Sequence, residues 1–234
     1  MYIYGKNVAL EALKKKEKIK KIFLYKNFKE EEIINLIKKN NINVKYLEKY
    51  EMDKLVNGLH QGIILDVEDY KYTKLEDILK VEDPLLVILD HLEDPHNLGA
   101  IIRTCEAAGV DGIIIPKDRS VCVNATVIKT SAATVNDVKI ALVTNIVNEI
   151  RNLKKQGFWI VGTDMKGTNY KKIDYKGKMA IVIGNEGNGI SNLVKQNCDF
   201  MATIPMNGKT NSLNASVAAG IMIYEAVSQR EMVK

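Results

Sequence analysis

The fold is decided by an apolar run that ends in a glycine-rich turn, Met179-Ala180-Ile181-Val182-Ile183-Gly184-Asn185-Glu186-Gly187-Asn188-Gly189. A strand that is apolar at every position is buried on both faces, and such strands belong to parallel sheets that helices cover. Three glycines within six residues allow tight backbone turns and the close approach of a ligand. The stretch therefore predicts an α/β domain with a binding site where this strand ends.

Similar apolar strands are predicted on either side of this stretch, at 85–89, 112–115, 158–162 and 200–204. They alternate with helical segments, which predicts one parallel-sheet domain over 84–234. Residues 1–70 contain shorter alternating helices and strands without a cluster of titratable or nucleophilic residues, and we interpret them as a separate α/β binding domain. Residues 71–83 are charged and lack a long apolar run, so we predict that they form the linker.

The charge of the chain is mildly basic, with a formal net charge of +5 over 234 residues. The first 72 residues contain 15 lysines and 11 acidic residues, so the excess is densest where the binding domain is predicted. Only four of the 34 basic residues are arginines, which draws attention to positions where lysine cannot replace a planar guanidinium. We see no apolar run long enough to span a membrane, no signal peptide and no CxxC pair, and we expect a cytoplasmic protein.

A polar segment and a helix follow the strand at 85–89. Asp94 before Pro95 has the pattern of a helix N-cap followed by a first-turn proline, and Asn97 is a second candidate cap. Arg103 lies off the apolar face of this helix. It is therefore either an ordinary exposed residue or a group that reaches into a site beside the sheet.

The strand at 200–204 also ends in a polar segment, before a helix that starts near Ser212 or Asn214. Capping of that helix accounts for one of these two residues but not for the long polar loop before them. Glu186, between the glycines of the opening stretch, is either solvated or positioned for a polar task. Because ligands of open α/β sheets bind beyond the carboxyl ends of the strands, the three turns predict one shared site.

In this order and spacing, the three turns resemble the three motifs of the SpoU/TrmH family of RNA ribose 2′-O-methyltransferases. Tyr4-Gly5-Lys6-Asn7-Val8, His60-Gln61-Gly62 and Pro116-Lys117-Asp118-Arg119-Ser120 match as well, so the resemblance covers nearly the whole chain. It is strongest to the subgroup that methylates a guanosine in the peptidyl-transferase region of 23S rRNA. It implies an α/β fold in which the parallel-sheet methyltransferase domain contains a deep trefoil knot and the small N-terminal RNA-binding domain is similar to a ribosomal protein. It also implies S-adenosylmethionine as cofactor, RNA as partner and a homodimer.

The resemblance implies roles for individual residues. Arg103 corresponds to the arginine that acts on the ribose hydroxyl, and the other polar positions of the active site correspond to Asn97, Glu186, Ser212 and Asn214. The cofactor pocket is implied to be lined by Gly184, Ile204 and Leu213, with Thr163 and Met206 as neighbours. No metal is expected, because a sulfonium already supplies an activated methyl group and the three histidines show no ligand spacing.

Three other functions stay open at this point. A tRNA ribose methyltransferase of the same family would have the same motifs, and a methylation assay on both RNAs separates the two. A non-catalytic RNA-binding assembly factor would keep the fold, although the joint presence of Arg103, Glu186, Ser212 and Asn214 argues against it. An ordinary nucleotide-binding enzyme is disfavoured because the glycine-rich turn lacks the GxGxxG fingerprint.

Overall fold

The computed structural model describes residues 1–231, which form two compact units. The first unit consists of Met1–Lys71 together with Val123–Val135, and the second contains the rest of the described chain. The chain therefore returns to the first unit after it has begun the second. The sequence did not predict this return.

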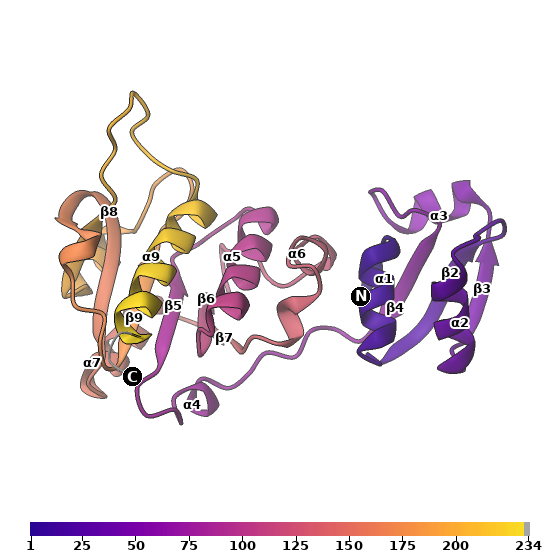
Figure 1. Ribbon diagram of the computed structural model, residues 1–234, viewed down its shortest axis with the longest axis horizontal. Coiled ribbons are helices and arrows are strands. Elements are labelled where there is room, and N and C mark those ends of the chain that lie inside the picture. Colours follow the sequence, from indigo (N-terminus) through magenta and orange to yellow (C-terminus); the bar gives the residue numbers. More distant parts are fainter. Residues whose placement is uncertain (232–234) are drawn as a thin grey trace. The chain divides into compact units, whose positions relative to one another are not determined.

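The first unit contains a mixed sheet of four strands in the order β1-β4-β2-β3 (Figure 1). Only β2 and β3 are parallel. Helices and strands alternate in it as predicted, and the short strand β1 forms the edge opposite β3. Helix α6 of the returning segment contacts β1. The elements are β1 (Tyr2–Tyr4), α1 (Lys6–Lys14), β2 (Ile19–Tyr25), α2 (Glu31–Lys39), β3 (Val44–Leu47), α3 (Lys49–Leu55), β4 (Ile63–Val67) and α6 (Ala125–Thr130).

The second unit contains a sheet of six strands in the order β10-β8-β9-β5-β6-β7. Every pair of neighbouring strands is parallel, which confirms the predicted parallel sheet. Strand β9 lies between β8 and β5, so the glycine-rich turn that follows it begins in the middle of the sheet. The strands are β5 (Leu85–Leu89), β6 (Gly112–Pro116), β7 (Ile140–Val143), β8 (Trp159–Asn169), β9 (Met179–Ile183) and β10 (Phe200–Thr203), of which β7 was not predicted.

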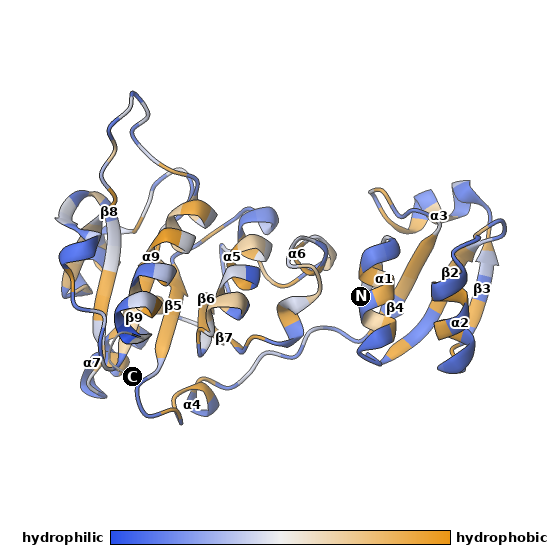
Figure 2. Ribbon diagram, viewed as in Figure 1, coloured by the Kyte–Doolittle hydropathy of each residue, from blue (hydrophilic) through white to orange (hydrophobic). Residues whose placement is uncertain are grey.

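Helices cover both faces of this sheet, as buried strands require. Helices α5 (Pro95–Ala108) and α9 (Ala215–Glu231) contact each other on one face, and α7 (Ile146–Lys155) and α8 (Asn192–Asn197) pack together on the other (Figure 1). Figure 2 shows apolar residues along strands such as β5 and on parts of α5 and α9. The core on the α7 side includes Ile88, Ile150 and Val182.

The predicted linker contains a short helix, α4 (Leu75–Ile78). Residues from Tyr72 onward belong to the second unit, and the side chain of Ile78 is fully buried in its core. The added Cβ of an alanine at Gly112 would lie 2.4 Å from Ile78 Cγ2, so Gly112 makes room for this side chain. The segment is therefore anchored to the sheet domain at Ile78.

Candidate active site

The turn after β9 is closed by its own backbone. Asn185 and Gly189 form an isolated antiparallel bridge, with backbone N–H···O distances of 3.0 and 2.9 Å in the two directions. A Cβ at Gly184 would lie 2.2 Å from the carbonyl carbon of Gly189, so no side chain fits there. Gly189 has a φ of 64°, a left-handed conformation that glycine adopts without steric cost. The glycines therefore determine the shape of this turn.

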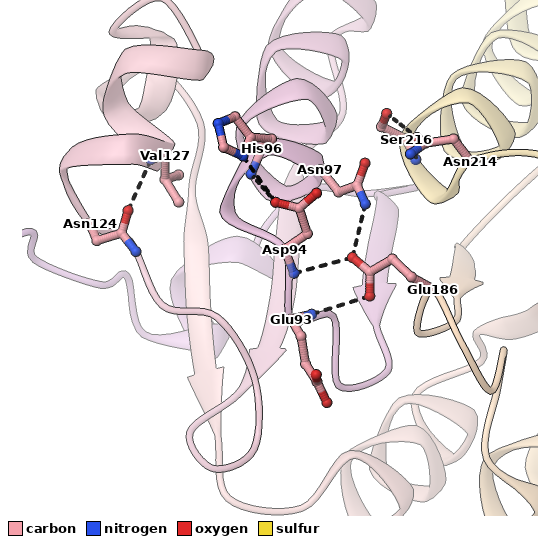
Figure 3. A network of polar contacts seen from close by, with 9 residues as sticks. All are labelled: Glu93, Asp94, His96, Asn97, Asn124, Val127, Glu186, Asn214 and Ser216. Atoms are coloured by element: carbon pink, nitrogen blue, oxygen red, sulfur yellow. Dashed lines mark hydrogen bonds and ion pairs between the residues drawn. The ribbon is translucent and has the colours of Figure 1, made fainter. Parts of the chain in front are cut away.

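Glu186 joins the turn after β9 to the start of α5 (Figure 3). Its Oε1 accepts hydrogen bonds from Asn97 Nδ2 at 2.9 Å and from the backbone N–H of Asp94 at 3.2 Å. Its Oε2 accepts a longer bond, of 3.4 Å, from the backbone N–H of Glu93. A carboxylate at a helix N-terminus is also favoured by the helix dipole. Glu186 thus connects two of the predicted motifs, and we call these three hydrogen bonds the Glu186 clamp.

Two residues that the sequence analysis did not single out strengthen this connection. Asp90, whose side chain is 1% exposed, follows β5 and accepts a 2.7 Å hydrogen bond from the backbone N–H of Ser191. Its other oxygen lies 2.7 Å from His91 Nδ1. Asn185 Nδ2 donates to the backbone carbonyl of His91 at 2.9 Å. The signal that could have identified Asp90 in the sequence is its position directly after a strand that is apolar at every residue.

The start of α5 follows the predicted pattern. Asp94 is the N-cap, accepting from the backbone N–H of His96 at 2.8 Å, and Pro95 occupies the first turn. Asn97 is buried and bonds Glu186, so its role is not that of a second cap.

Burial raises the pKa of the Cys105 thiol, near the end of α5, far above its ordinary value, which makes this thiol an unreactive core group.

Arg103 lies in the middle of α5 and is exposed, as predicted from its place off the apolar face. Among the described residues, its guanidinium makes no hydrogen bond or ion pair. The guanidiniums of Arg151 and Arg230, by contrast, bond protein groups: Arg151 bonds Asn197, and Arg230 bonds the carbonyls of Tyr175, Gly177 and Asp83. Arg103 is therefore free to bind a ligand.

The turn after β10 differs from the other two because it is exposed over 205–214. Asn214 caps α9, since its Oδ1 accepts bonds from the backbone N–H and the hydroxyl of Ser216 at 2.9 and 2.6 Å. Ser212 makes no such bond within the described chain, so of the two candidate caps only Asn214 has that role. Figure 3 shows Asn214 and Ser216 at the start of α9, whose packing against α5 brings this turn toward the Asn97–Glu186 pair.

Of the residues implied for the cofactor pocket, Thr163 lies on β8 and the others lie in the segments that follow β9 and β10. Thr163 on β8 donates to the carbonyl of Val182 at 3.1 Å, one strand away and two residues before Gly184. Ile204 is half-buried directly after β10, and Met206 and Leu213 are each 36% exposed. Helices α5 and α9 also pack closely beyond the site, since a Cβ at Gly220 of α9 would lie 3.9 Å from Thr104 Cγ2 of α5.

The described part of the chain contains neither a metal-binding cluster of side chains nor a membrane-spanning helix. Within residues 1–231, no group of three or more histidine, cysteine, aspartate or glutamate side chains is placed to hold a metal ion. In the same part of the chain, none of the helices is long and apolar enough to cross a membrane.

Comparison with known proteins places this geometry in a family. Residues 84–224 match the model of the SpoU rRNA Methylase family, and residues 2–73 match a model described as RNA 2′-O ribose methyltransferase substrate binding. The chain belongs to the SpoU family. The protein YacO of Bacillus subtilis strain 168, which is named as a TrmH family tRNA/rRNA methyltransferase, is 41% identical over 99% of this chain and 97% of its own length.

Solved structures of SpoU proteins have the same fold. The SpoU methyltransferase AviRb from Streptomyces viridochromogenes, in complex with the cofactor AdoMet, aligns with a TM-score of 0.84 at 24% identity over 98% of this chain and 89% of that one. An AdoMet-bound rRNA methyltransferase from Sinorhizobium meliloti aligns with a TM-score of 0.77 at 28% identity, over 96% and 85% of the two chains. Both alignments extend over the two units of this SpoU protein.

Proposed function

We propose that this protein transfers a methyl group from S-adenosylmethionine to the 2′-hydroxyl of a guanosine in the peptidyl-transferase region of 23S rRNA, the activity of the subgroup called RlmB. The observation that carries the proposal is the Glu186 clamp, which holds the first and second SpoU motifs together at the start of α5, the helix that carries the unpaired Arg103. The family supplies the reaction class. The choice of 23S rRNA rests on the resemblance of the motifs and on the substrate-binding match over 2–73.

The groups available at the turn after β10 fit an amphiphilic cofactor. Residues 204–213 make no hydrogen bond or ion pair within the described chain, so their backbone N–H and C=O groups are free to bind polar atoms. Met206 and Leu213 add exposed apolar surface suited to an adenine ring. We assign the cofactor pocket to these residues together with Gly184, Ile204 and Thr163. When bound there, S-adenosylmethionine supplies an activated methyl group.

The residues of this chain have the task of aligning the ribose and binding charge. Guanidinium keeps its proton at neutral pH, so we assign Arg103 to the phosphate or to the developing alkoxide rather than to proton removal. Asn97 and Glu186 fix the start of α5 and with it the position of Arg103. Ser212 and Asn214 are assigned to the ribose side of the site.

A homodimer belongs to the same proposal. Val217 and Tyr224, seven residues apart on α9, are 49% and 52% exposed, so they lie on one side of this helix as an apolar surface. Burial of these side chains by a second copy would complete the covering of α9. Light scattering of the purified protein gives its mass in solution, and a monomer at all concentrations would contradict this part of the proposal.

The function is tested by methylation of purified RNAs. The full chain, incubated with radiolabelled S-adenosylmethionine, is expected to label a 23S rRNA transcript and not a 16S rRNA or tRNA pool, with the label mapped to one guanosine by mass spectrometry. Arg103→Lys keeps the charge but loses the fork, and we expect turnover to fall at least about a hundredfold, the scale of a lost transition-state contact. Labelling of tRNA alone would redirect the assignment to a tRNA enzyme. No labelling of any RNA, together with no calorimetric binding of S-adenosylmethionine, would favour a non-catalytic factor.

A further inference from the structure

A second arginine, Arg119, stands in the loop that follows β6, in the Pro116–Ser120 segment to which no role has been given. Strand β6 is the parallel neighbour of β5, so this loop and the 90–97 turn emerge at the same edge of the sheet. The Ser120 hydroxyl and the Val121 backbone N–H both donate to the carbonyl of Leu92, at 3.0 and 2.7 Å. Arg119 is therefore held next to the turn whose end Glu186 clamps.

The backbone of Arg119 has a φ of 52°, in the left-handed region that glycine favours. A residue with a Cβ atom loses free energy in that conformation, which six other non-glycine residues of the described chain also adopt, His91 of the neighbouring turn among them. The loop is fixed on both sides of the arginine, because the backbone N–H of Lys117 also donates to Val143 on β7 at 2.9 Å. Hydrogen bonds on both sides of Arg119 therefore hold its backbone in this conformation.

The guanidinium of Arg119 is exposed and makes no hydrogen bond or ion pair among the described residues. In a chain with four arginines, two are used to bond protein groups, and Arg103 and Arg119 are the two that are not. Lys117 and Asp118 precede it in the loop, so residues 117–119 carry one net positive charge. A guanidinium binds phosphate through two parallel N–H groups, which lysine cannot do.

We propose that Arg119 binds a backbone phosphate of the RNA substrate next to the nucleotide that is methylated, as a substrate-positioning residue distinct from Arg103. This inference rests on the proposed function. It assigns the two unpaired arginines different tasks: Arg103 acts at the reacting ribose, and Arg119 holds the adjoining phosphate. Loss of Arg119 should then weaken RNA binding while leaving the chemical step and the cofactor pocket intact.

The test compares three variants of the full-length protein. Arg119→Gly removes the guanidinium but suits a φ of 52°, Arg119→Lys keeps the charge without the fork, and Arg151→Gln removes one positive charge from α7 as a matched control. With a 23S rRNA transcript, we expect Arg119→Gly to raise KM about tenfold, the effect of about 1.4 kcal/mol of binding, with kcat within about twofold of wild type. The slope of log affinity against log salt should fall by about one. Arg119→Lys should recover part of the affinity, and Arg151→Gln should match wild type.

Two controls separate the possible failures. Calorimetry with S-adenosylmethionine and thermal melting should give wild-type values for Arg119→Gly; if this variant melts early, Arg119→Asn replaces it, because asparagine also tolerates the left-handed conformation. If wild type methylates RNA and Arg119→Gly has the KM and salt slope of Arg151→Gln, the inference is overturned and the proposed function stands. If wild type methylates no RNA, the proposed function fails, and RNA binding by the same variants still decides the role of Arg119.

Discussion

The turn after β9 and the turn after β10 both belong to the proposed site but are held in different ways. Residues 184–191 are bonded to one another and to the 90–97 turn through four side chains, those of Asp90, Asn97, Asn185 and Glu186. Residues 204–213 make no hydrogen bond in the described chain, and the capping bonds of Asn214 begin only where α9 starts.

This difference indicates a division of labour. Polar groups that are paired within the protein keep a turn in shape without a ligand, and unpaired backbone groups remain available to bind one. We infer that the first two motifs form a preorganised frame, and that the third motif takes its final form around the cofactor. Substitutions should therefore have large effects on stability in the frame and small effects in the third turn.

The largest contrast is expected between two glycines. At Gly184 an added methyl group would lie 2.2 Å from a backbone carbon, whereas at Gly208 nothing lies within 4 Å. We expect Gly184→Ala to lower the free energy of unfolding by about 3 kcal/mol or more and to abolish cofactor binding, and Gly208→Ala to change stability by less than about 0.5 kcal/mol. Urea unfolding followed by the fluorescence of Trp159, the one tryptophan of the chain, measures both. Equal stability of the two variants would contradict the proposed difference between the turn after β9 and the turn after β10.

A smaller loss is expected at Asp90. Replacement by asparagine leaves one acceptor oxygen, for Ser191 N–H, removes the buried negative charge, and places an amide NH2 group against His91 Nδ1, which then has to accept a hydrogen bond. We expect Asp90→Asn to lower the free energy of unfolding by about 2 kcal/mol. Asp118→Asn makes the same chemical change at an exposed position and should leave stability within about 0.5 kcal/mol of wild type. If both substitutions cost the same, Asp90 is not part of the frame.

The sequence predicted the frame only in part. The parallel sheet followed from strands that are apolar at every position, and the turn after β9 followed from its glycines. Asp90 was missed because an acidic residue at a strand end is ordinarily solvated, and only the packed structure reveals that a Ser191 N–H lies opposite it. Local sequence predicted Asn97 only as a possible cap. Its bond to Glu186 joins residues 89 positions apart, and local sequence does not reveal such a contact.

Other features depended on tertiary contacts that local sequence does not encode. The segment Val123–Val135 carries ordinary helix signals, including the N-cap Asn124, but nothing in it predicts that it groups with the first unit. Strand β7 was not predicted, although β10, which was, has the same length of four residues. For the third turn the sequence left two candidate caps, and the bonds of Asn214 decide between them.

Glu186 offers a finer test of the frame, because glutamine keeps its shape. In Glu186→Gln the carbonyl oxygen can still accept from Asp94 and Asn97, so the one bond lost is the 3.4 Å contact with Glu93, along with the negative charge at the start of α5. We expect a loss of about 1 kcal/mol in the free energy of unfolding. Glu106→Gln, on the exposed side of α5, is the control and should be silent. A Glu186→Gln variant as stable as the control would mean that the carboxylate serves the ligand and not the frame.

The smallest effect is expected in the third turn, at the point where it becomes helix. Asn214→Ala removes the two bonds to Ser216 and should cost about 0.5 to 1 kcal/mol, because a lost N-cap at an exposed helix end is worth about that much. Asn211→Ala, in the unbonded part of the turn, should leave the apoprotein unchanged, since its side chain has no partner among the described residues. Amide hydrogen exchange provides the decisive measurement, because it reports each residue separately. Without cofactor, the amides of 205–213 should exchange fast in wild type and in both variants, while those of Asn185 and Gly189, paired in their bridge, exchange slowly. Added S-adenosylmethionine should then slow exchange in 205–213 alone. Slow exchange there before any ligand is added would mean that the third motif is preorganised too, and the difference between the turns would not be one of function.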